Sequence, residues 1–216
     1  MNFTMSAIAG RRVLGVEPQQ AVSDLCLVVV FALLMAPAAQ MKIEAEPVPY
    51  TLQVLFVLLT GLTLGPWRGA AAMLLYAVLG FAGLPVFARG GGPAYFLTPT
   101  AGYIYGFVVA AFVTGMTARV LHERFGPTVL GSKGVILRFV RIDLLAALAG
   151  VPFVYIFGVN HLALYYVLAT DELNPWGKAW GVGAGIFIWY DVLKACIAGA
   201  LVSSAGMRRE GLRGNR

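Results

Sequence analysis

The segment 181–205, GVGAGIFIWYDVLKACIAGALVSSA, is apolar along most of its length but carries Asp191 and Lys194 near its middle. A transmembrane helix needs about 20 mainly apolar residues, and residues three apart share one helix face. A charge at the centre of such a helix costs about 2.5–3.5 kcal/mol on insertion scales, so intramembrane charges usually face a cavity or each other. The segment therefore predicts a membrane-spanning helix that carries a polar site.

Two interpretations of this charge pair are open from the residues alone. Asp191 and Lys194 can form a mutual salt bridge that serves helix packing, or they can line a polar cavity that receives a ligand. We favour the cavity.

The composition of the whole chain agrees with a membrane protein. Of its 216 residues, 59% are hydrophobic and 12% are charged, and the mean hydropathy is +0.79. A soluble domain carries about 25% charged residues, so this chain has too few to cover a water-soluble surface. The composition excludes a disordered protein, a coiled coil and a nucleic-acid-binding protein.

Six apolar segments approach or reach the length of a membrane span, and the chain leaves little room for a soluble domain. We therefore expect an all-α integral membrane protein with six transmembrane helices, forming one membrane domain over residues 1–216. The expected spans are 24–39, 52–64, 70–84, 102–120, 142–166 and 181–205.

The basic residues predict the orientation. With six spans, one side holds twelve basic residues: Arg11, Arg12, Arg68, Arg119, Arg124, Lys133, Arg138, Arg141, Arg208, Arg209, Arg213 and Arg216. The other side holds three, Lys42, Arg89 and Lys178. The positive-inside rule then places both termini in the cytoplasm. The pI near 9.5 reflects this topology, and no nucleic-acid partner is needed to explain it.

Two connections on the expected outer side have the composition of ordered loops. The first, EAEPVPYTLQ (44–53), enters the second span, and the second, LPVFARGGGPAYFLTPT (84–100), is rich in Gly, Pro and aromatic residues. Long ordered loops are usually functional. Arg89 is the one base in the second loop, and a ligand carboxylate is its natural partner; the alternative is an arginine that reaches the lipid headgroups.

Small residues recur four apart, a spacing that allows helices to approach closely within lipid. We expect most of these pairs to serve internal packing, although any of them could face a partner protein. The pairs are Ala32 with Ala36, Gly61 with Gly65, Gly102 with Gly106, and Gly181 with Gly185.

Motifs for catalysis are incomplete. The segment 126–133, GPTVLGSK, has the glycine spacing of a phosphate-binding loop, but its Ser and Lys are in reversed order. The chain has two histidines, His122 and His161, too few for a histidine-rich metal site. We expect no catalytic residues, no metal and no cofactor, so any ATP hydrolysis must come from another chain.

Four ordered motifs resemble the BioY family, the biotin-specific membrane subunits (S components) of energy-coupling-factor vitamin transporters. They are PVPYTLQVLFVL (47–58), GLTLGP (61–66), GFAGLPVF (80–87) and PTAGY (99–103), and the likeness extends through Asp191 and Lys194.

The resemblance implies six helices, an outward-facing biotin pocket and a loop after the third helix that covers the ligand. It implies a bacterial plasma or inner membrane location, a transmembrane coupling subunit and ABC ATPase subunits as partners. The candidate substrate-binding residues are Asp191, Lys194, Arg89, Tyr95, Tyr103, Thr51 and Gln53.

The resemblance also implies a docking patch of small residues on the first helix. Ala32 and Ala36 match it, and Pro37 would bend the helix just beyond them.

The chemistry of biotin agrees with this assignment, because an acid with an apolar chain and a ureido ring calls for an apolar, aromatic site with a few placed polar groups. Which charge meets which end of biotin stays open. The main alternative is a stand-alone proton-linked carrier for a small carboxylate vitamin that uses Asp191 as its proton site. An intramembrane enzyme would need a nucleophile or metal set, and a structural subunit would not need the Arg89 loop.

Overall fold

The computed structural model describes residues 18–125 and 132–213, and most of them are helical. Most of the phosphate-loop-like segment lies outside the described residues, as do Arg11, Arg12 and Arg216. The helices are α1 (Pro18–Gln40), α2 (Gln53–Leu64), α3 (Pro66–Phe81), η1 (Pro93–Leu97), α4 (Ala101–Phe125), α5 (Ser132–Ala169), α6 (Pro175–Trp180), η2 (Gly181–Gly185) and α7 (Ile188–Arg213).

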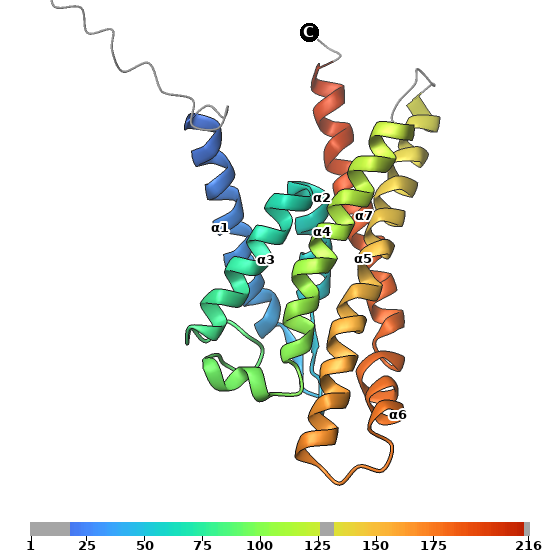
Figure 1. Ribbon diagram of the computed structural model, residues 1–216. Coiled ribbons are helices and arrows are strands. Elements are labelled where there is room, and N and C mark those ends of the chain that lie inside the picture. Colours follow the sequence, from blue (N-terminus) through green and yellow to red (C-terminus); the bar gives the residue numbers. More distant parts are fainter. Residues whose placement is uncertain (1–17, 126–131, 214–216) are drawn as a thin grey trace, which may run out of the picture.

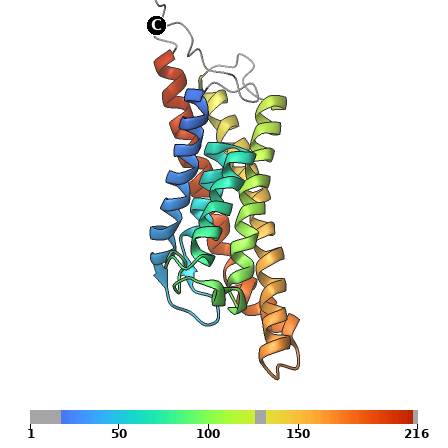
Figure 2. The ribbon, with the colours of Figure 1, turned by 60° about the vertical axis from the view of Figure 1, so that its left-hand side comes forward.

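The long helices lie roughly parallel to one common axis (Figures 1 and 2). The start of α1, the α2–α3 turn and the end of α7 lie at one end of the bundle, which we call the terminal end. The opposite end, the loop end, holds three connections: residues 41–52, 82–100 and 170–174. This alternation of helix directions is the one expected if successive helices cross a membrane.

The coarse fold prediction is confirmed. Each predicted span overlaps a helix, and four helical stretches of the described chain are long and apolar enough to cross a membrane. They are Gln19–Gln40, Ala101–Phe125, Arg141–Ala169 and Pro175–Ala205. The other two predicted spans correspond to the shorter helices α2 and α3, of 12 and 16 residues.

A small hairpin departs from the all-helical expectation. Strand β1 (Lys42–Ile43) pairs antiparallel with β2 (Tyr50–Thr51), so that Lys42 lies opposite Thr51. It connects α1 to α2 at the loop end. The backbone groups of this connection cannot join a helix because Pro47 and Pro49 interrupt it, and a short ladder satisfies some of them instead.

The turn between α2 and α3 depends on Gly65. Its φ of 77° lies in the left-handed region that glycine adopts without steric cost. Pro66 follows at the first position of α3, where its missing N–H would have no helical partner in any case. This turn reverses the chain within one residue, so α2 and α3 run antiparallel.

Several of the predicted small-residue contacts are confirmed as internal packing. A Cβ placed on Gly61 would lie 2.5 Å from the Ala111 carbonyl oxygen, and one on Gly102 would lie 2.2 Å from the His161 Cβ. Gly115 packs against the α2–α3 turn, where a Cβ would lie 2.5 Å from the Pro66 nitrogen. Helices in lipid have no hydrophobic drive between them, so such close backbone packing contributes to their association.

The spacing does not indicate a helix contact at every position. A Cβ on Gly181 would have no neighbour within 4 Å, so this glycine does not mediate a helix contact. It lies in η2, where the helical turn widens. A four-residue spacing selects residues on one helix face, but it does not say whether that face meets another helix.

We expect Gly115→Ala to lower the thermal stability of the purified protein. The added methyl group must displace backbone atoms of the α2–α3 turn, and overpacking of this kind costs about 1–3 kcal/mol. Gly181→Ala is the matched control, since its methyl group enters open space. Thermal unfolding in detergent measures both; an unfolding midpoint for Gly115→Ala at or above that of Gly181→Ala would contradict the packing argument.

Candidate substrate-binding site

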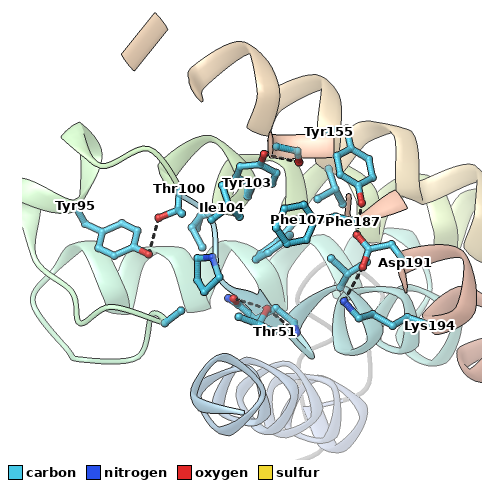
Figure 3. Close-up of a pocket in the computed structure, with 17 residues that line it drawn as sticks. Thr51, Tyr95, Thr100, Tyr103, Ile104, Phe107, Tyr155, Phe187, Asp191 and Lys194 are labelled. Carbon is cyan, nitrogen blue, oxygen red and sulfur yellow. Dashed lines mark hydrogen bonds and ion pairs between the residues drawn. The ribbon is translucent and has the colours of Figure 1, made fainter. Parts of the chain in front are cut away.

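A cavity lies in the half of the bundle nearer the loop end, between α2, α4, α5 and α7 (Figure 3). Its wall is largely apolar and aromatic, with a few polar groups placed in it. The lining residues are Val48, Pro49, Thr51, Gln53, Val54, Ala88, Tyr95, Thr100, Tyr103, Ile104, Phe107, Val154, Tyr155, Gly183, Phe187, Asp191 and Lys194.

Asp191 is the centre of the polar part. Asp191 is 3% exposed, and each of its carboxylate oxygens accepts a hydrogen bond. Lys194 Nζ lies 2.7 Å from Oδ1, and the Tyr155 hydroxyl donates to Oδ2 at 2.5 Å. The two interpretations of the pair are therefore both partly right: Asp191 and Lys194 form a salt bridge, and the salt bridge lines a cavity.

The start of α7 is shaped by its glycines. Residues Gly181–Gly185 form a wide π-type turn before α7, and such turns are frequent at functional sites. Tyr103 from α4 donates its hydroxyl to the Gly183 carbonyl at 2.8 Å. A Cβ on Gly183 would lie 2.6 Å from that hydroxyl oxygen, so glycine allows Tyr103 to approach and to fix α4 against the entry of α7.

Thr51 and Gln53 hold the start of α2 at the cavity. Thr51 Oγ1 accepts from the Gln53 backbone N–H at 3.2 Å and donates to the Gln53 side-chain oxygen at 3.0 Å. The Gln53 amide donates to the Tyr76 hydroxyl at 2.9 Å, and that hydroxyl donates to the Val86 carbonyl at 3.1 Å. This chain of hydrogen bonds links α2, α3 and the loop 82–100.

Tyr95 and Thr100 form the wall toward the loop. Their hydroxyl groups lie 2.9 Å apart. Burial raises the pKa of Tyr95, while the hydrogen bond to Thr100 and the charge of Arg89 act in the opposite direction. Tyr95 therefore stays neutral at physiological pH and presents a hydroxyl group and a ring to the cavity.

The loop 82–100 packs closely against the end of α3. The side chain of Phe87 is fully buried, and a Cβ on Gly80 would lie 2.1 Å from its ring. Gly92 donates to the Gly80 carbonyl at 2.7 Å, and the rings of Phe81 and Phe96 stack at 3.8 Å. The Gly-rich loop is thus ordered, as its composition predicted, and Ala88, Tyr95 and Thr100 from this loop line the cavity.

Arg89 does not line this cavity, although its neighbour Ala88 does. Its guanidinium group points to the first connection, where it forms ion pairs with Glu46 at 3.1 Å and Glu44 at 3.5 Å. It also donates to the carbonyl groups of Ala45 and Pro47. The structure therefore shows Arg89 joining the two loops, and the predicted contact with a ligand is not part of this geometry.

Glu44 connects this pair of loops to β1. It forms an ion pair with Lys42 at 2.6 Å. The hydrogen bond from Lys42 and the charges of Lys42 and Arg89 lower the pKa of Glu44, against a smaller effect of desolvation.

Ala32 and Ala36 are not on one open face. Ala32 is 1% exposed and packs in the core of the bundle, whereas Ala36 is half-buried. A partner could contact Ala32 directly only if α1 moved away from its neighbours. The docking role of this pair stays a prediction.

The structure thus brings together six of the seven predicted substrate-binding residues: Asp191, Lys194, Tyr95, Tyr103, Thr51 and Gln53. Sequence analysis missed Tyr155 and Thr100. Tyr155 lies in the middle of the predicted span 142–166, and its place in the sequence does not show which helix its hydroxyl group faces. Thr100 belongs to the motif PTAGY (99–103), and this motif does not show where its hydroxyl group lies.

Comparisons with known proteins agree with the fold and show the family. The BioY family model matches residues 10–210. The chain is 35% identical over 176 residues to a probable biotin transporter BioY of Pyrococcus horikoshii, covering 81% of this chain and 91% of that protein. It is 35% identical over 170 residues to the biotin transporter BioY of Thermotoga maritima, covering 78% and 87%.

A solved structure shows the same fold. The crystal structure of the S-component for biotin from an ECF-type ABC transporter superposes with a TM-score of 0.65 at 24% identity, covering 89% of this chain and 95% of that chain. With a family model over most of its length and two relatives above 30% identity, this chain belongs to the BioY family.

Proposed function

We propose that this chain is the substrate-specific membrane subunit of an energy-coupling-factor transporter and that it binds biotin for uptake. The proposal is supported by its membership of the BioY family and by relatives that are named biotin transporters. The observation that carries it is the cavity in which Asp191, Lys194 and Tyr155 form a polar group within apolar and aromatic walls.

The chemistry of this group fits biotin. A lysine ammonium has three donors, and Asp191 accepts one of them, so Lys194 retains donors for an acceptor oxygen of the ligand. Biotin has such oxygens in its carboxylate and its ureido carbonyl, while its ureido N–H groups are donors that suit Asp191. The valeryl chain and thioether ring fit walls such as Phe107 and Phe187.

We further propose six membrane spans with both termini in the cytoplasm. Helices α2 and α3 are short, but together they run toward the terminal end and back among the longer helices (Figure 1). The sequence places twelve basic residues on the terminal side and three on the loop side, which favours a cytoplasmic terminal end. The cavity then opens toward the outside of a bacterial plasma or inner membrane.

Partner subunits complete the transporter in this proposal. The chain has no complete phosphate-binding motif, so a transmembrane coupling subunit and ABC ATPase subunits supply ATP hydrolysis. The docking of α1 through Ala32 and Ala36 is part of the proposal, with the added requirement that α1 shifts to expose Ala32.

Radiolabelled biotin binding to the purified chain without ATP tests the proposal directly. We expect retention of biotin by the chain alone, because the binding groups all belong to it. A proton-linked carrier would show no tight retention, and its uptake in vesicles would follow a proton gradient. Absence of biotin binding by a folded chain would contradict the proposal.

Asp191→Asn and Lys194→Met should each weaken biotin binding by at least about tenfold. Each change leaves the other buried charge without its partner, and breaking such a pair costs about 3–5 kcal/mol, of which part is relieved by relaxation. Lys178→Met is the matched control, because Lys178 pairs with Glu172 at the loop end but lies outside the cavity. Equilibrium binding measures all three, and unchanged affinity in both cavity variants would remove the pair from the site.

Tyr155→Phe should weaken biotin binding by about tenfold while retaining the fold. It keeps the ring but removes one donor to Asp191, and a hydrogen bond to a charged group contributes about 1.5–3 kcal/mol. Tyr165→Phe on the same helix is the control, since Tyr165 does not line the cavity. Isothermal titration gives both affinities; equal values would show that Tyr155 does not position Asp191 for binding.

A further inference from the structure

A second hollow lies beside the cavity, on the face where the first connection meets α7. Its wall includes Met41, Lys42, Ile43 and Leu52 from the chain between α1 and α2, together with Tyr190 from α7. We call it the side groove. It is open to the surroundings of the protein: Ile43 is 73% exposed and Tyr190 is 55% exposed.

The side groove and the cavity share two lining residues, Thr51 and Lys194. Figure 3 shows both residues at the cavity, with Lys194 directed to Asp191. The Lys194 side chain borders both the cavity and the side groove. It therefore forms part of the wall that separates them. A side chain in this position can change rotamer without any opening of the backbone.

The contacts across this wall are also side-chain contacts. Tyr50 packs on Phe187 with ring centroids 4.3 Å apart and on Tyr190 at 5.4 Å. In the described part of the chain, no hydrogen bond joins residues 41–52 to α7. The loop 82–100, in contrast, is fixed to the bundle by backbone hydrogen bonds and buried rings.

The charge of the groove suits an anionic ligand. Two ammonium groups, those of Lys42 and Lys194, border it, and no carboxylate residue does so within the described lining. Lys42 is paired with Glu44 and Lys194 with Asp191. The side chains between them are mainly apolar, so the groove combines a cationic inner end with walls for an aliphatic chain.

We propose that the side groove is the access path by which an amphipathic carboxylate ligand enters and leaves the cavity, passing Lys194. The ligand class follows from the apolar walls and the ammonium at the inner end. The proposal rests on the proposed function, with biotin as the ligand. It places the entrance between the β1–β2 hairpin and α7, and leaves loop 82–100 in place during exchange.

An access path has a kinetic signature that a binding contact lacks. A substitution that narrows the path slows association and dissociation by the same factor, so the dissociation constant does not change. A substitution that removes a contact with the bound ligand changes the dissociation constant. Ile43 lines the side groove and not the cavity, so it separates these two effects.

We would attach a bulky thiol reagent at the groove after folding, using Ile43→Cys in a background with Cys26→Ala and Cys196→Ala, because both native cysteines are exposed. Biotin association and dissociation rates are measured on the full chain in nanodiscs before modification, after modification with a bulky methanethiosulfonate, and after its removal with dithiothreitol. Leu173→Cys in the same background is the control, since Leu173 is fully exposed in the connection 170–174 at the same end.

We expect modification at Ile43→Cys to slow both rates by the same factor, at least about threefold, and dithiothreitol to restore them. Modification at Leu173→Cys should leave both rates unchanged. Unchanged rates at Ile43→Cys, or a change in only one of the two rates and therefore in the dissociation constant, would overturn the proposal. Failure of the unmodified chain to bind biotin would contradict the proposed function itself, so the two failures are distinguishable.

Discussion

The structure depends on the ion pair between Asp191 and Lys194, which has to be satisfied inside a membrane helix. An isolated charge there is costly, and the pair at 2.7 Å reduces that cost only if the remaining hydrogen-bonding capacity is also used. Tyr155 meets this need on the protein side by donating to the second oxygen of Asp191. In the proposed function, a ligand with its own donors and acceptors would meet it on the cavity side. The same chemistry thus explains why the pair is tolerated and what it can recognise.

The helices around this pair are held in place by close backbone contacts. Gly102 and Gly106 let α4 lie directly on α5, and Gly115 lets it lie on the α2–α3 turn. At the entry of α7, the wide turn at Gly183 brings a carbonyl group to Tyr103. These contacts fix α4, α5 and α7 relative to one another, so the cavity between them is a preformed site. A second buried polar cluster, in which His122 and Ser203 both contact Asp143, joins the same three helices nearer the terminal end.

Much of this arrangement could be predicted from the sequence. The apolar segments predicted the helices, and the three-residue spacing of Asp191 and Lys194 predicted that they share one helix face. Both predictions succeed because helical geometry depends on local sequence. Arg89 shows where this reasoning ends: a base among glycines suggested a ligand contact, but Glu44 and Glu46 are its partners. Ala32 is a second example. Its spacing from Ala36 predicts a shared helix face, but whether that face is buried depends on how α1 packs against its neighbours. Tyr155 escaped notice because only the packing of α5 against α7 brings it to Asp191.

In the proposed function, biotin occupies the cavity at Asp191 and Lys194. A structure of the purified chain determined with bound biotin, by crystallography or electron cryomicroscopy, tests it most directly. We expect density for biotin between α2, α4, α5 and α7, with a polar atom of the ligand within hydrogen-bonding distance of Asp191 or Lys194. Biotin bound elsewhere, or in the cavity without contact to either residue, would show that this pair is not the binding site.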